Sequence, residues 1–300
     1  MAKAPMASIL QESDTKRREL LAKMEKITNS RVISYAANPN ASPNMIDHND
    51  PVFLNDLLAS CGKVKKLDLI IDSPGGEPNV AEKIAIMCRE YCDQFRVIVP
   101  NNAKSAATMI AIASDEIMMG YISEIGPIDP QIRVVAPNGQ FSYVPAQSII
   151  DSIGLLNDAM QQGIDPRCII AILQKVDPPL LDIANKAIAF SKQFAAEWLS
   201  KHMLKDNPEK AKKIAAQLSD NRKWLSHGKR IGYAEAKELG LKVTLIPKDD
   251  PLWEVLWEYY SRCQIHLNSR LSQKLYETRD LTLNFGLTVA RPPSPVPPQQ

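Results

Sequence analysis

The sequence has few cysteines and they do not fall into a pattern that would hold a small secreted protein together. The five cysteines among its 300 residues are Cys61, Cys88, Cys92, Cys168 and Cys263. An odd number of cysteines, with no secretory leader at the N-terminus, argues against a disulfide framework. Cys88 and Cys92 lie one helical turn apart, but no second Cys or His pair completes a zinc site. Two buried thiols are the simpler interpretation.

The chain also has little net charge and no long apolar run. It carries 36 Lys and Arg against 34 Asp and Glu, a formal net charge of +2. Because the basic residues are spread along the chain, no electrostatic case for nucleic acid arises. No window contains 18 uninterrupted apolar residues, so no membrane span is expected. These absences together predict a protein of the reducing cytoplasm.

What the sequence does have is a central region in which short apolar runs alternate with helical periodicity. The runs 67–72, 96–100 and 116–120 read "LDLIID", "RVIVP" and "EIMMG". Such short apolar runs are typical of strands buried on both faces. Residues 80–92 and 105–115, which lie between them, have apolar side chains at helical spacing. A strand-helix-strand-helix-strand order of this length indicates right-handed parallel βαβ units, and therefore an α/β fold.

The flanking regions predict further helices, two more strands and a tail. The polar segment "NPNASPN" indicates a loop, and "RPPSPVPPQQ" at the end is proline-rich and typical of an extended tail. We expect strands at 30–36 and 242–246. We expect helices or mainly helical segments at 8–28, 50–64, 141–203, 233–241 and 252–277.

Two strand ends of the central region carry residues suited to binding a negative charge. "SPGG" (73–76) follows one strand, and "NNAKS" (101–105) follows its neighbour. The carboxyl ends of parallel strands meet at one rim, where ligands of open α/β folds usually bind. Gly75 and Gly76 allow close approach of the backbone, and Ser105 opens a helix whose first N–H groups favour negative charge. The N–H groups of this rim could therefore form an oxyanion hole.

The same residues also have a purely structural interpretation. Pro-Gly-Gly after a strand is often only a turn, and a serine before a helix is usually an N-cap. The G-x-S-x-G motif of α/β-hydrolases is absent from the sequence. From the residues alone, Ser105 is either a cap or a nucleophile.

The order of four motifs resembles a known superfamily. "SPGG", "AKSAAT", "DEIMM" and "GPIDPQ" follow one another as in the Clp-protease/crotonase superfamily. The sequence is most similar to the serine dehydrogenase proteinase family, which is related to signal peptide peptidase A. The resemblance covers about residues 30–245. It implies a Clp-protease/crotonase-like fold of repeated ββα and βαβ units, with a helical arm and outer helices.

The resemblance implies a serine peptidase site. Ser105 corresponds to the nucleophile, and the N–H groups of Gly76 and Ala106 correspond to the oxyanion hole, with Gly75 beside them. Gly76 and Ser105 are separated by the same interval as their counterparts in Clp proteases. Relatives often have Ser-Gly-Gly where this chain has Ser105-Ala106-Ala107. An alanine still donates its N–H, so the departure weakens the match only slightly.

The resemblance leaves two candidates for the general base. Clp proteases place a histidine near "GPIDPQ" and an aspartate near the last helix-strand unit, whereas this chain has Asp129 and His227 there. The serine dehydrogenase proteinase family has that exchanged order, which a triad tolerates because geometry defines it. Signal peptide peptidases use a lysine instead, and Lys186 has the most apolar neighbours in the sequence. We favour His227, since histidine titrates near neutral pH, and expect Lys104 to point away from Ser105.

The implied function is an ATP-independent serine peptidase acting on peptides or unfolded segments, without a cofactor or metal. Two other functions share the geometry: a non-catalytic Clp-like scaffold subunit and a crotonase-type acyl-CoA enzyme. The resemblance also implies a homo-oligomer. The expected parts are an N-terminal helical extension, a protease domain, a C-terminal helical segment and a proline-rich tail, at 1–29, 30–247, 248–290 and 291–300.

Overall fold

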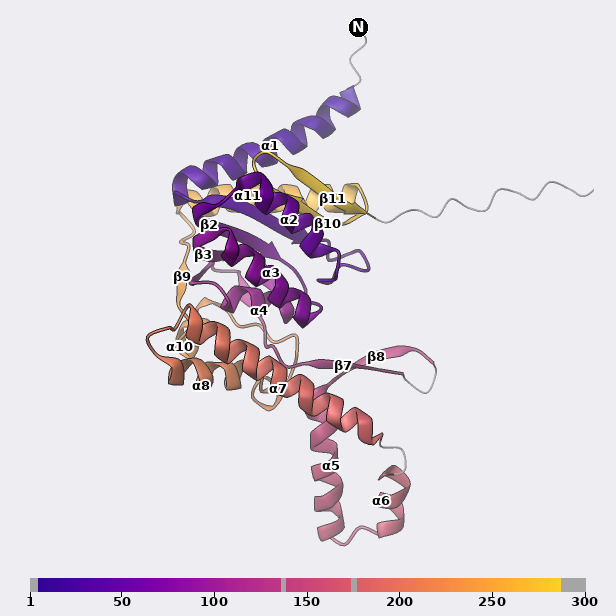
Figure 1. Cartoon of the computed structure of the whole chain (residues 1–300). Coiled ribbons are helices and arrows are strands. Elements are labelled where there is room, and N and C mark those ends of the chain that lie inside the picture. Colours follow the sequence, from indigo (N-terminus) through magenta and orange to yellow (C-terminus); the bar gives the residue numbers. More distant parts are fainter. Residues whose placement is uncertain (1–4, 136–138, 174–176, 287–300) are drawn as a thin grey trace, which may run out of the picture.

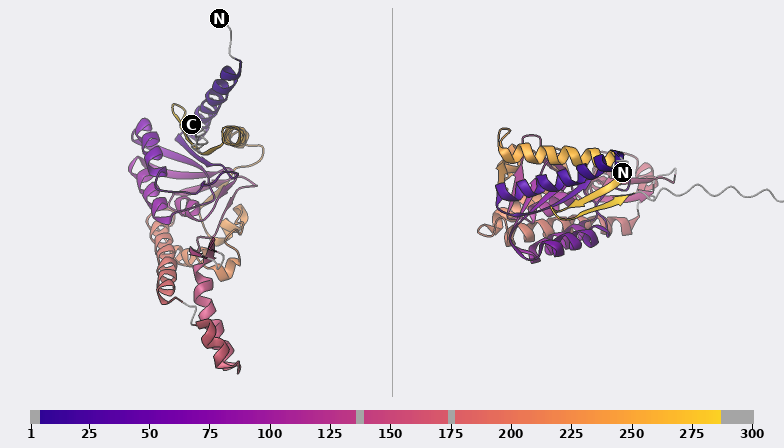
Figure 2. Two further views of the ribbon diagram at one scale, coloured as in Figure 1. Left: turned by 90° about the vertical axis from the view of Figure 1, so that its right-hand side faces the viewer. Right: turned by 90° about the horizontal axis from the view of Figure 1, so that it is seen from above.

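The computed structural model describes residues 5–135, 139–173 and 177–286 (Figure 1). The proline-rich tail expected at 291–300 lies outside the described residues. The described chain forms a layered α/β body from which a helical arm extends, as the two turned views in Figure 2 show.

A seven-stranded sheet is the centre of the body, with the order β11-β10-β1-β2-β3-β5-β9. The five strands from β1 to β9 are parallel to one another, and β10 and β11 are antiparallel additions at one edge. The bounds are β1 Arg31–Ala37, β2 Val64–Asp72, β3 Cys92–Val99, β5 Glu116–Met119, β9 Val243–Leu245, β10 Ser272–Glu277 and β11 Thr282–Gly286. The strands expected at 30–36, 67–72, 96–100, 116–120 and 242–246 therefore form the parallel part of this sheet.

Helices cover both faces of the sheet, because the inner strands are apolar on both sides. Leu67, Leu69 and Ile71 of β2 face one core, and Ile70 faces the other. The first core lies under α2 Asp50–Cys61, α3 Pro78–Glu90 and α4 Ala106–Ile112. The second lies under α1 Pro5–Thr28 and α11 Pro251–Ser269. In Figure 2, α1 and α11 lie together on one side of the sheet.

The helix expected over 252–277 ends early. α11 stops at Ser269, Leu271 takes a left-handed conformation with φ of 52°, and the chain turns back as β10. Residues 272–277 then pair with β1, which would otherwise be an open edge of the sheet. All six side chains of β10 are buried, including Lys274. The gain from covering the edge outweighs the helical pattern of the local sequence.

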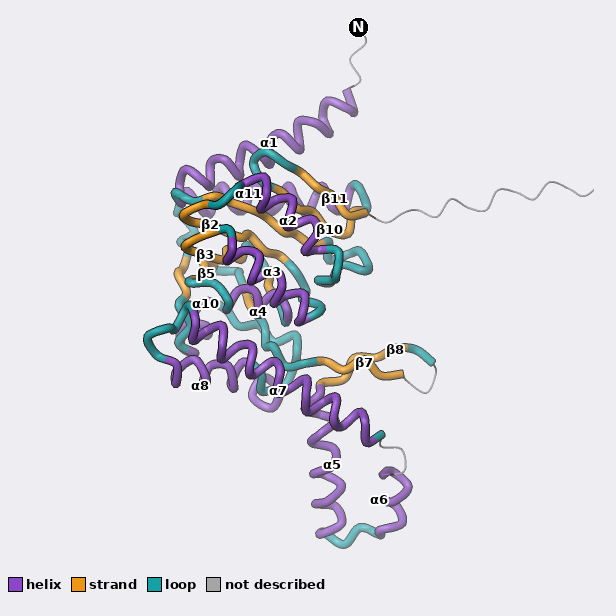
Figure 3. The backbone as a smooth tube through the Cα atoms, in the orientation of Figure 1, coloured by secondary structure: helices purple, strands orange, loops and turns teal. Residues whose placement is uncertain are grey.

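The arm is built by the middle of the chain. Its elements are the hairpin strands β7 Gln131–Val135 and β8 Phe141–Pro145, followed by α5 Ala146–Gln161, α6 Pro166–Leu173 and α7 Pro178–Lys201. The hairpin, α5 and α6 extend away from the body, while α7 leads back to it (Figure 3). The mainly helical segment expected from 141 therefore begins with a strand, because Phe141–Pro145 pairs with β7.

Short elements complete the body. They are β4 Asn102–Ala103, β6 Glu124–Ile125, α8 Pro208–Leu218, α9 Asn221–Trp224 and α10 Tyr233–Leu239. Strand β4 pairs with β6, and Ile125 of β6 bridges to Ile231. Within the described part of the chain, no helix combines the length and apolar character needed to cross a lipid bilayer.

Candidate active site

The segments after β2 and β3 lie side by side at one rim of the sheet. Ser73 forms a parallel bridge with Ala103. The N–H of Ser73 donates to the carbonyl of Asn102 at 3.0 Å, and the N–H of Lys104 donates to the carbonyl of Ser73 at 3.0 Å. These two bonds bring the Pro-Gly-Gly turn next to Ser105, as the parallel topology predicts.

Ser105 stands at the N-cap position of α4 but caps nothing. Its side chain makes no capping hydrogen bond, and its backbone has φ of 50° and ψ of −116°. Residues other than glycine adopt such angles rarely, at a cost of roughly 1–3 kcal/mol, and they concentrate at functional sites. The structural role that a serine usually has before a helix is therefore not the role of Ser105.

Two glycines permit close contacts that no other residue would allow. A Cβ on Gly75, whose φ is 102°, would lie 2.6 Å from the carbonyl oxygen of Lys104 and 2.7 Å from Cβ of Ser105. A Cβ on Gly76 would lie 2.3 Å from the carbonyl oxygen of Ile46. The Pro-Gly-Gly turn is thus enclosed between the Ser105 turn and the segment around Ile46.

The hydrogen bonds of Ile46 fix the direction of the Gly76 N–H. The carbonyl of Gly75 accepts from the N–H of Ile46 at 2.7 Å, and the N–H of Glu77 donates to the carbonyl of Ile46 at 3.0 Å. In a planar trans peptide the C=O and the next N–H point in opposite directions. The N–H of Gly76 therefore points away from Ile46.

Two backbone donors are left unused beside Ser105. The N–H of Ala107 already donates to the carbonyl of Lys104 at 2.8 Å. Within the described residues, the N–H groups of Gly76 and Ala106 have no acceptor. Free N–H groups at such a turn can stabilise an oxyanion.

A buried ion cluster anchors the segment around Ile46. The ammonium of Lys274, which is fully buried on β10, lies 2.8 Å from Oδ2 of Asp47 and 2.9 Å from Oδ1 of Asp50. The hydroxyl of Tyr276 also bonds Asp50. Breaking a buried pair of this kind is costly, because it leaves an uncompensated charge.

Asp129 and His227 are paired. Nδ1 of His227 lies 2.9 Å from Oδ1 of Asp129, whose other carboxylate oxygen accepts from Nδ2 of Asn221 at 2.8 Å and from Nε2 of Gln131 at 3.1 Å. Asp129 is buried, whereas the side chain of His227 is 30% exposed. With Nδ1–H donating to the carboxylate, Nε2 of a neutral imidazole is the acceptor.

His227 and Ser105 are not hydrogen-bonded to each other. Within the described residues, neither Oγ of Ser105 nor Nε2 of His227 has a partner. The turn that carries Ser105 and the loop that carries His227 are nevertheless in contact, because the side chain of Lys104 reaches the carbonyls of Gly228 and Lys229. Catalytic hydrogen bonds are often loose in a structure without substrate.

The structure places Lys186 elsewhere. It lies on α7, its side chain is 76% exposed, and its ammonium is 2.5 Å from Asp182. Lys186 is thus solvated and paired with a carboxylate on its own helix. The ammonium of Lys104, which we expected to point away from Ser105, lies 2.7 Å from Glu124.

Asp72, at the end of β2, forms hydrogen bonds that hold the segment after β3 in place. It is buried and accepts from the backbone N–H of Asn102 at 3.1 Å, from the Asn102 amide at 2.8 Å and from Gln264 at 3.0 Å. Burial raises the pKa of Asp72 to about 7, against the opposing effect of these hydrogen bonds. The roles of Asp72, Ile46 and Asn221 could not be found by sequence reasoning, because no motif marks them.

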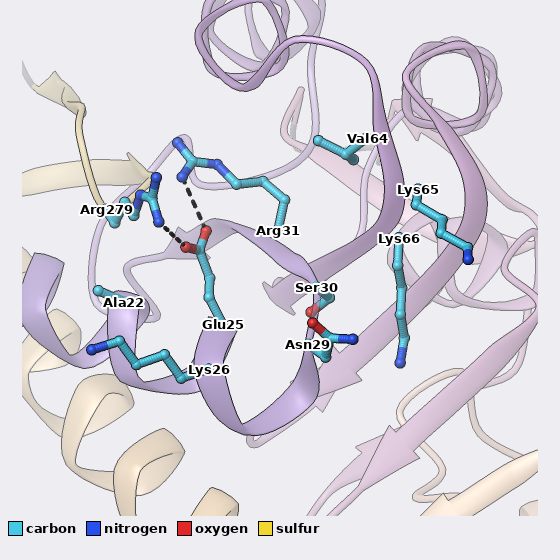
Figure 4. A pocket seen from close by; sticks show the side chains of 10 residues that line it. All are labelled: Ala22, Glu25, Lys26, Asn29, Ser30, Arg31, Val64, Lys65, Lys66 and Arg279. Carbon is cyan, nitrogen blue, oxygen red and sulfur yellow. Dashed lines mark hydrogen bonds and ion pairs between the residues drawn. The ribbon is translucent and has the colours of Figure 1, made fainter.

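A separate hollow of about 410 Å³ lies at the other end of the strands (Figure 4). In it, Glu25 lies between Arg31 at 3.3 Å and Arg279 at 2.9 Å. The hollow contains no residue of the Ser105 rim. Among the described residues, no group of His, Cys, Asp and Glu side chains could hold a metal ion.

Comparison with known proteins gives a family and two relatives. Residues 4–266 match the model of the ClpP-like SDH-type serine proteinases. Two uncharacterized proteins of Methanocaldococcus jannaschii are similar: one is 37% identical over 62% of this chain and 57% of its own length. The other is 35% identical over 61% of this chain and 53% of its own length. The chain thus spans just over half the length of these relatives.

Solved structures with a similar course of the chain have low sequence identity. A serine-to-alanine variant of the 1510-N membrane-bound stomatin-specific protease is 16% identical over 67% of this chain and 75% of its own, with a TM-score of 0.40. ClpP1 from Listeria monocytogenes is 13% identical over 76% of this chain and 98% of its own, with a TM-score of 0.38. The ClpP catalytic domain from Plasmodium falciparum is 14% identical over 77% of this chain and 91% of its own, with a TM-score of 0.37.

Proposed function

The chain belongs to the ClpP-like SDH-type serine proteinases, and on that premise we propose that it is an ATP-independent serine peptidase with Ser105 as nucleophile. His227 is the general base and Asp129 orients it. The observation that carries this proposal is the 2.9 Å contact between His227 and the buried Asp129. The loop of His227 is bonded by Lys104, whose neighbour Ser105 is held in a strained backbone conformation.

The reaction proceeds through an acyl-enzyme. Nε2 of His227 takes the proton of the Ser105 hydroxyl, and Oγ attacks the scissile carbonyl carbon. The carbonyl oxygen becomes an oxyanion, which the N–H groups of Gly76 and Ala106 stabilise. His227 then gives its proton to the leaving amine as the C–N bond breaks. A water molecule, deprotonated by His227, hydrolyses the ester and releases Ser105.

Asp129 determines which nitrogen of His227 acts as the base. Its carboxylate accepts from Nδ1–H, which leaves the lone pair on Nε2, and it stabilises the imidazolium that forms. The bonds from Asn221 and Gln131 to the other oxygen hold the carboxylate in place.

We propose that peptides or unfolded segments are the substrates and that the protein forms a homo-oligomer. The arm supports self-association, because many of its large apolar side chains are exposed. They include Val135, Phe141, Tyr143, Leu155, Met160, Ile164, Ile170 and Ile183. Apolar patches of this kind usually mark an interaction surface. We expect a cytoplasmic setting, in which thiols such as Cys61 stay reduced.

Labelling with a fluorophosphonate probe tests the nucleophile. The probe should react with the wild-type protein and with Ser152→Ala, which changes an exposed serine on α5, but not with Ser105→Ala. Circular dichroism should show that Ser105→Ala is folded. If folded wild-type protein is not labelled, the scaffold interpretation is favoured, and labelling of Ser105→Ala would show that another residue reacts.

A further inference from the structure

Lys104 directly precedes Ser105, and its side chain crosses to the loop that carries His227. Its ammonium lies 2.7 Å from Oε1 of Glu124 and donates to the carbonyls of Gly228 at 3.4 Å and Lys229 at 3.3 Å. An ammonium group has three N–H donors, so each has an acceptor. The two carbonyls belong to the residues that follow His227.

The path of the Lys104 side chain is kept open by a glycine. A Cβ on Gly126 would lie 2.8 Å from Cδ of Lys104. Gly126 is in turn fixed to α4, because its N–H donates to Oγ1 of Thr108 at 3.0 Å. The side chain of Lys104 is only 15% exposed as a result, so it is held along one course and does not sample solvent freely.

Glu124 connects Lys104 to the far end of the same loop. Its second carboxylate oxygen lies 3.3 Å from Nε of Arg230. Next to it, Ile125 and Ile231 exchange two backbone hydrogen bonds of 3.0 Å. The loop is thus tied to β6 at its end and to Lys104 in its middle.

The other side-chain contacts of the loop lie near the protein surface: Lys229 is 3.4 Å from Glu235, and Arg230 donates to the carbonyl of Tyr121 at 3.3 Å. Leu225 is 86% exposed, and Ser226, Lys229 and Arg230 are exposed as well. Segments with few buried apolar contacts open locally at low free-energy cost. The position of His227 therefore depends on its contact with Asp129 and on the bonds from Lys104.

We infer that Lys104 is a positioning residue, which sets the distance between the His227 loop and the turn that carries Ser105. Asp129 fixes the plane and tautomer of the ring, whereas Lys104 fixes the backbone behind it. The catalytic part of this inference rests on the proposed peptidase function. The structural part, that Lys104 holds the loop, does not.

Hydrogen exchange measured by mass spectrometry on the full chain tests the structural part. Lys104→Met keeps an unbranched side chain, one atom shorter, and removes its charge. It should speed the exchange of amides 226–230 about tenfold or more, since the hydrogen bonds from Lys104 to the middle of the loop are lost. Lys104→Arg should restore most of the protection. The matched control is Lys212→Met, which removes an exposed Lys–Glu pair of 2.8 Å on α8 and should change nothing in this loop.

Kinetics with fluorescently labelled casein test the catalytic part. Lys104→Met should lower kcat by about tenfold to a hundredfold, as expected for a misplaced base, with KM changed less than about twofold. Lys104→Arg and Glu124→Gln should lie between this variant and the wild type. A uniformly destabilised protein would instead show a lowered Tm, and its activity would recover at lower temperature.

Each result decides one part. Unchanged exchange in residues 226–230 of Lys104→Met overturns the inference, whether or not the protein is active. Faster exchange with an unchanged kcat shows that Lys104 holds the loop but that the position of the loop does not limit catalysis. That result overturns the catalytic part of the inference. A wild-type protein that neither cleaves casein nor reacts with fluorophosphonate refutes the proposed function, and exchange still tests the anchor.

Discussion

Asp129 and His227 are 98 positions apart in the sequence, and Oδ1 of one lies 2.9 Å from Nδ1 of the other. Asp129 is buried and makes two further hydrogen bonds, whereas His227 is reached by solvent at the edge of the rim. A carboxylate held in this way can keep a histidine ring in one orientation. Removing the Asp129 carboxylate should therefore affect catalysis far more than substrate binding.

Asp129→Asn should lower kcat by about three to four orders of magnitude, because the amide can stabilise the wrong imidazole tautomer. KM for labelled casein should change little. Asp182→Asn is the matched control, since it alters an exposed carboxylate on α7, and it should retain wild-type kcat. A loss of less than tenfold in Asp129→Asn would contradict the orienting role.

His227→Ala should remove the burst of acyl-enzyme formation, while Lys186→Ala should leave the burst intact. The reason is that Lys186 is solvated and paired with Asp182 on its own helix, and not with Ser105. Rapid mixing with an activated ester measures both variants. Full activity in His227→Ala would exclude the proposed triad.

Gly75→Ala should destabilise the protein by about 3 kcal/mol or more and abolish labelling of Ser105. The added Cβ would meet the Lys104 carbonyl and Ser105, and the left-handed backbone adds its own cost. Gly163→Ala shares the positive φ, 84°, but has no atom within 4 Å of the added Cβ. That control should lose only about 1–2 kcal/mol. Urea unfolding measures both, and equal losses would show that the contact with Ser105 is unimportant.

Asp72 should make the stability of the protein depend on pH. Its pKa of about 7 in the folded state is above the ordinary value of 3.8, so the folded protein binds the proton more tightly than the unfolded chain does. The contribution of Asp72 to the free energy of unfolding is therefore fully present below about pH 4. It is lost as the pH rises towards 7, by roughly 4 kcal/mol at most.

Asp72→Asn, which stays neutral, should remove that loss. Urea unfolding at pH 5 and pH 8 should show the variant gaining stability relative to the wild type at the higher pH. A difference between the two proteins that is the same at both pH values would show that Asp72 titrates normally.

The sequence was sufficient to predict the parallel part of the fold. The short, mainly apolar runs at 67–72, 96–100 and 116–120 are typical of buried strands, and the structure confirms them as parts of β2, β3 and β5. The sequence was not sufficient to predict strand β10. "SQKLYE" continues the helical pattern of α11, and its pairing with β1 depends on an edge formed more than 200 residues earlier.

The candidate site could be predicted in part. The topology explains why Gly75 and Ser105 lie at one rim, and the family resemblance indicated Asp129 and His227. The strained backbone of Ser105 and the contacts of Lys104 with Glu124 and the His227 loop could not be predicted, because both depend on residues distant in the sequence. Ile46 illustrates the limit: nothing in "PNMIDHND" shows that its backbone will pair with Gly76.

The anchoring of Ile46 by Lys274 has a consequence for the order of synthesis. β10 leaves the ribosome after Ser105, Asp129 and His227. Until it does, Asp47 and Asp50 lack the cation that holds them, and the segment that orients the Gly76 N–H is not fixed. Under the proposed mechanism, a nascent chain that lacks β10 would carry an unfinished oxyanion hole and would not cleave peptides.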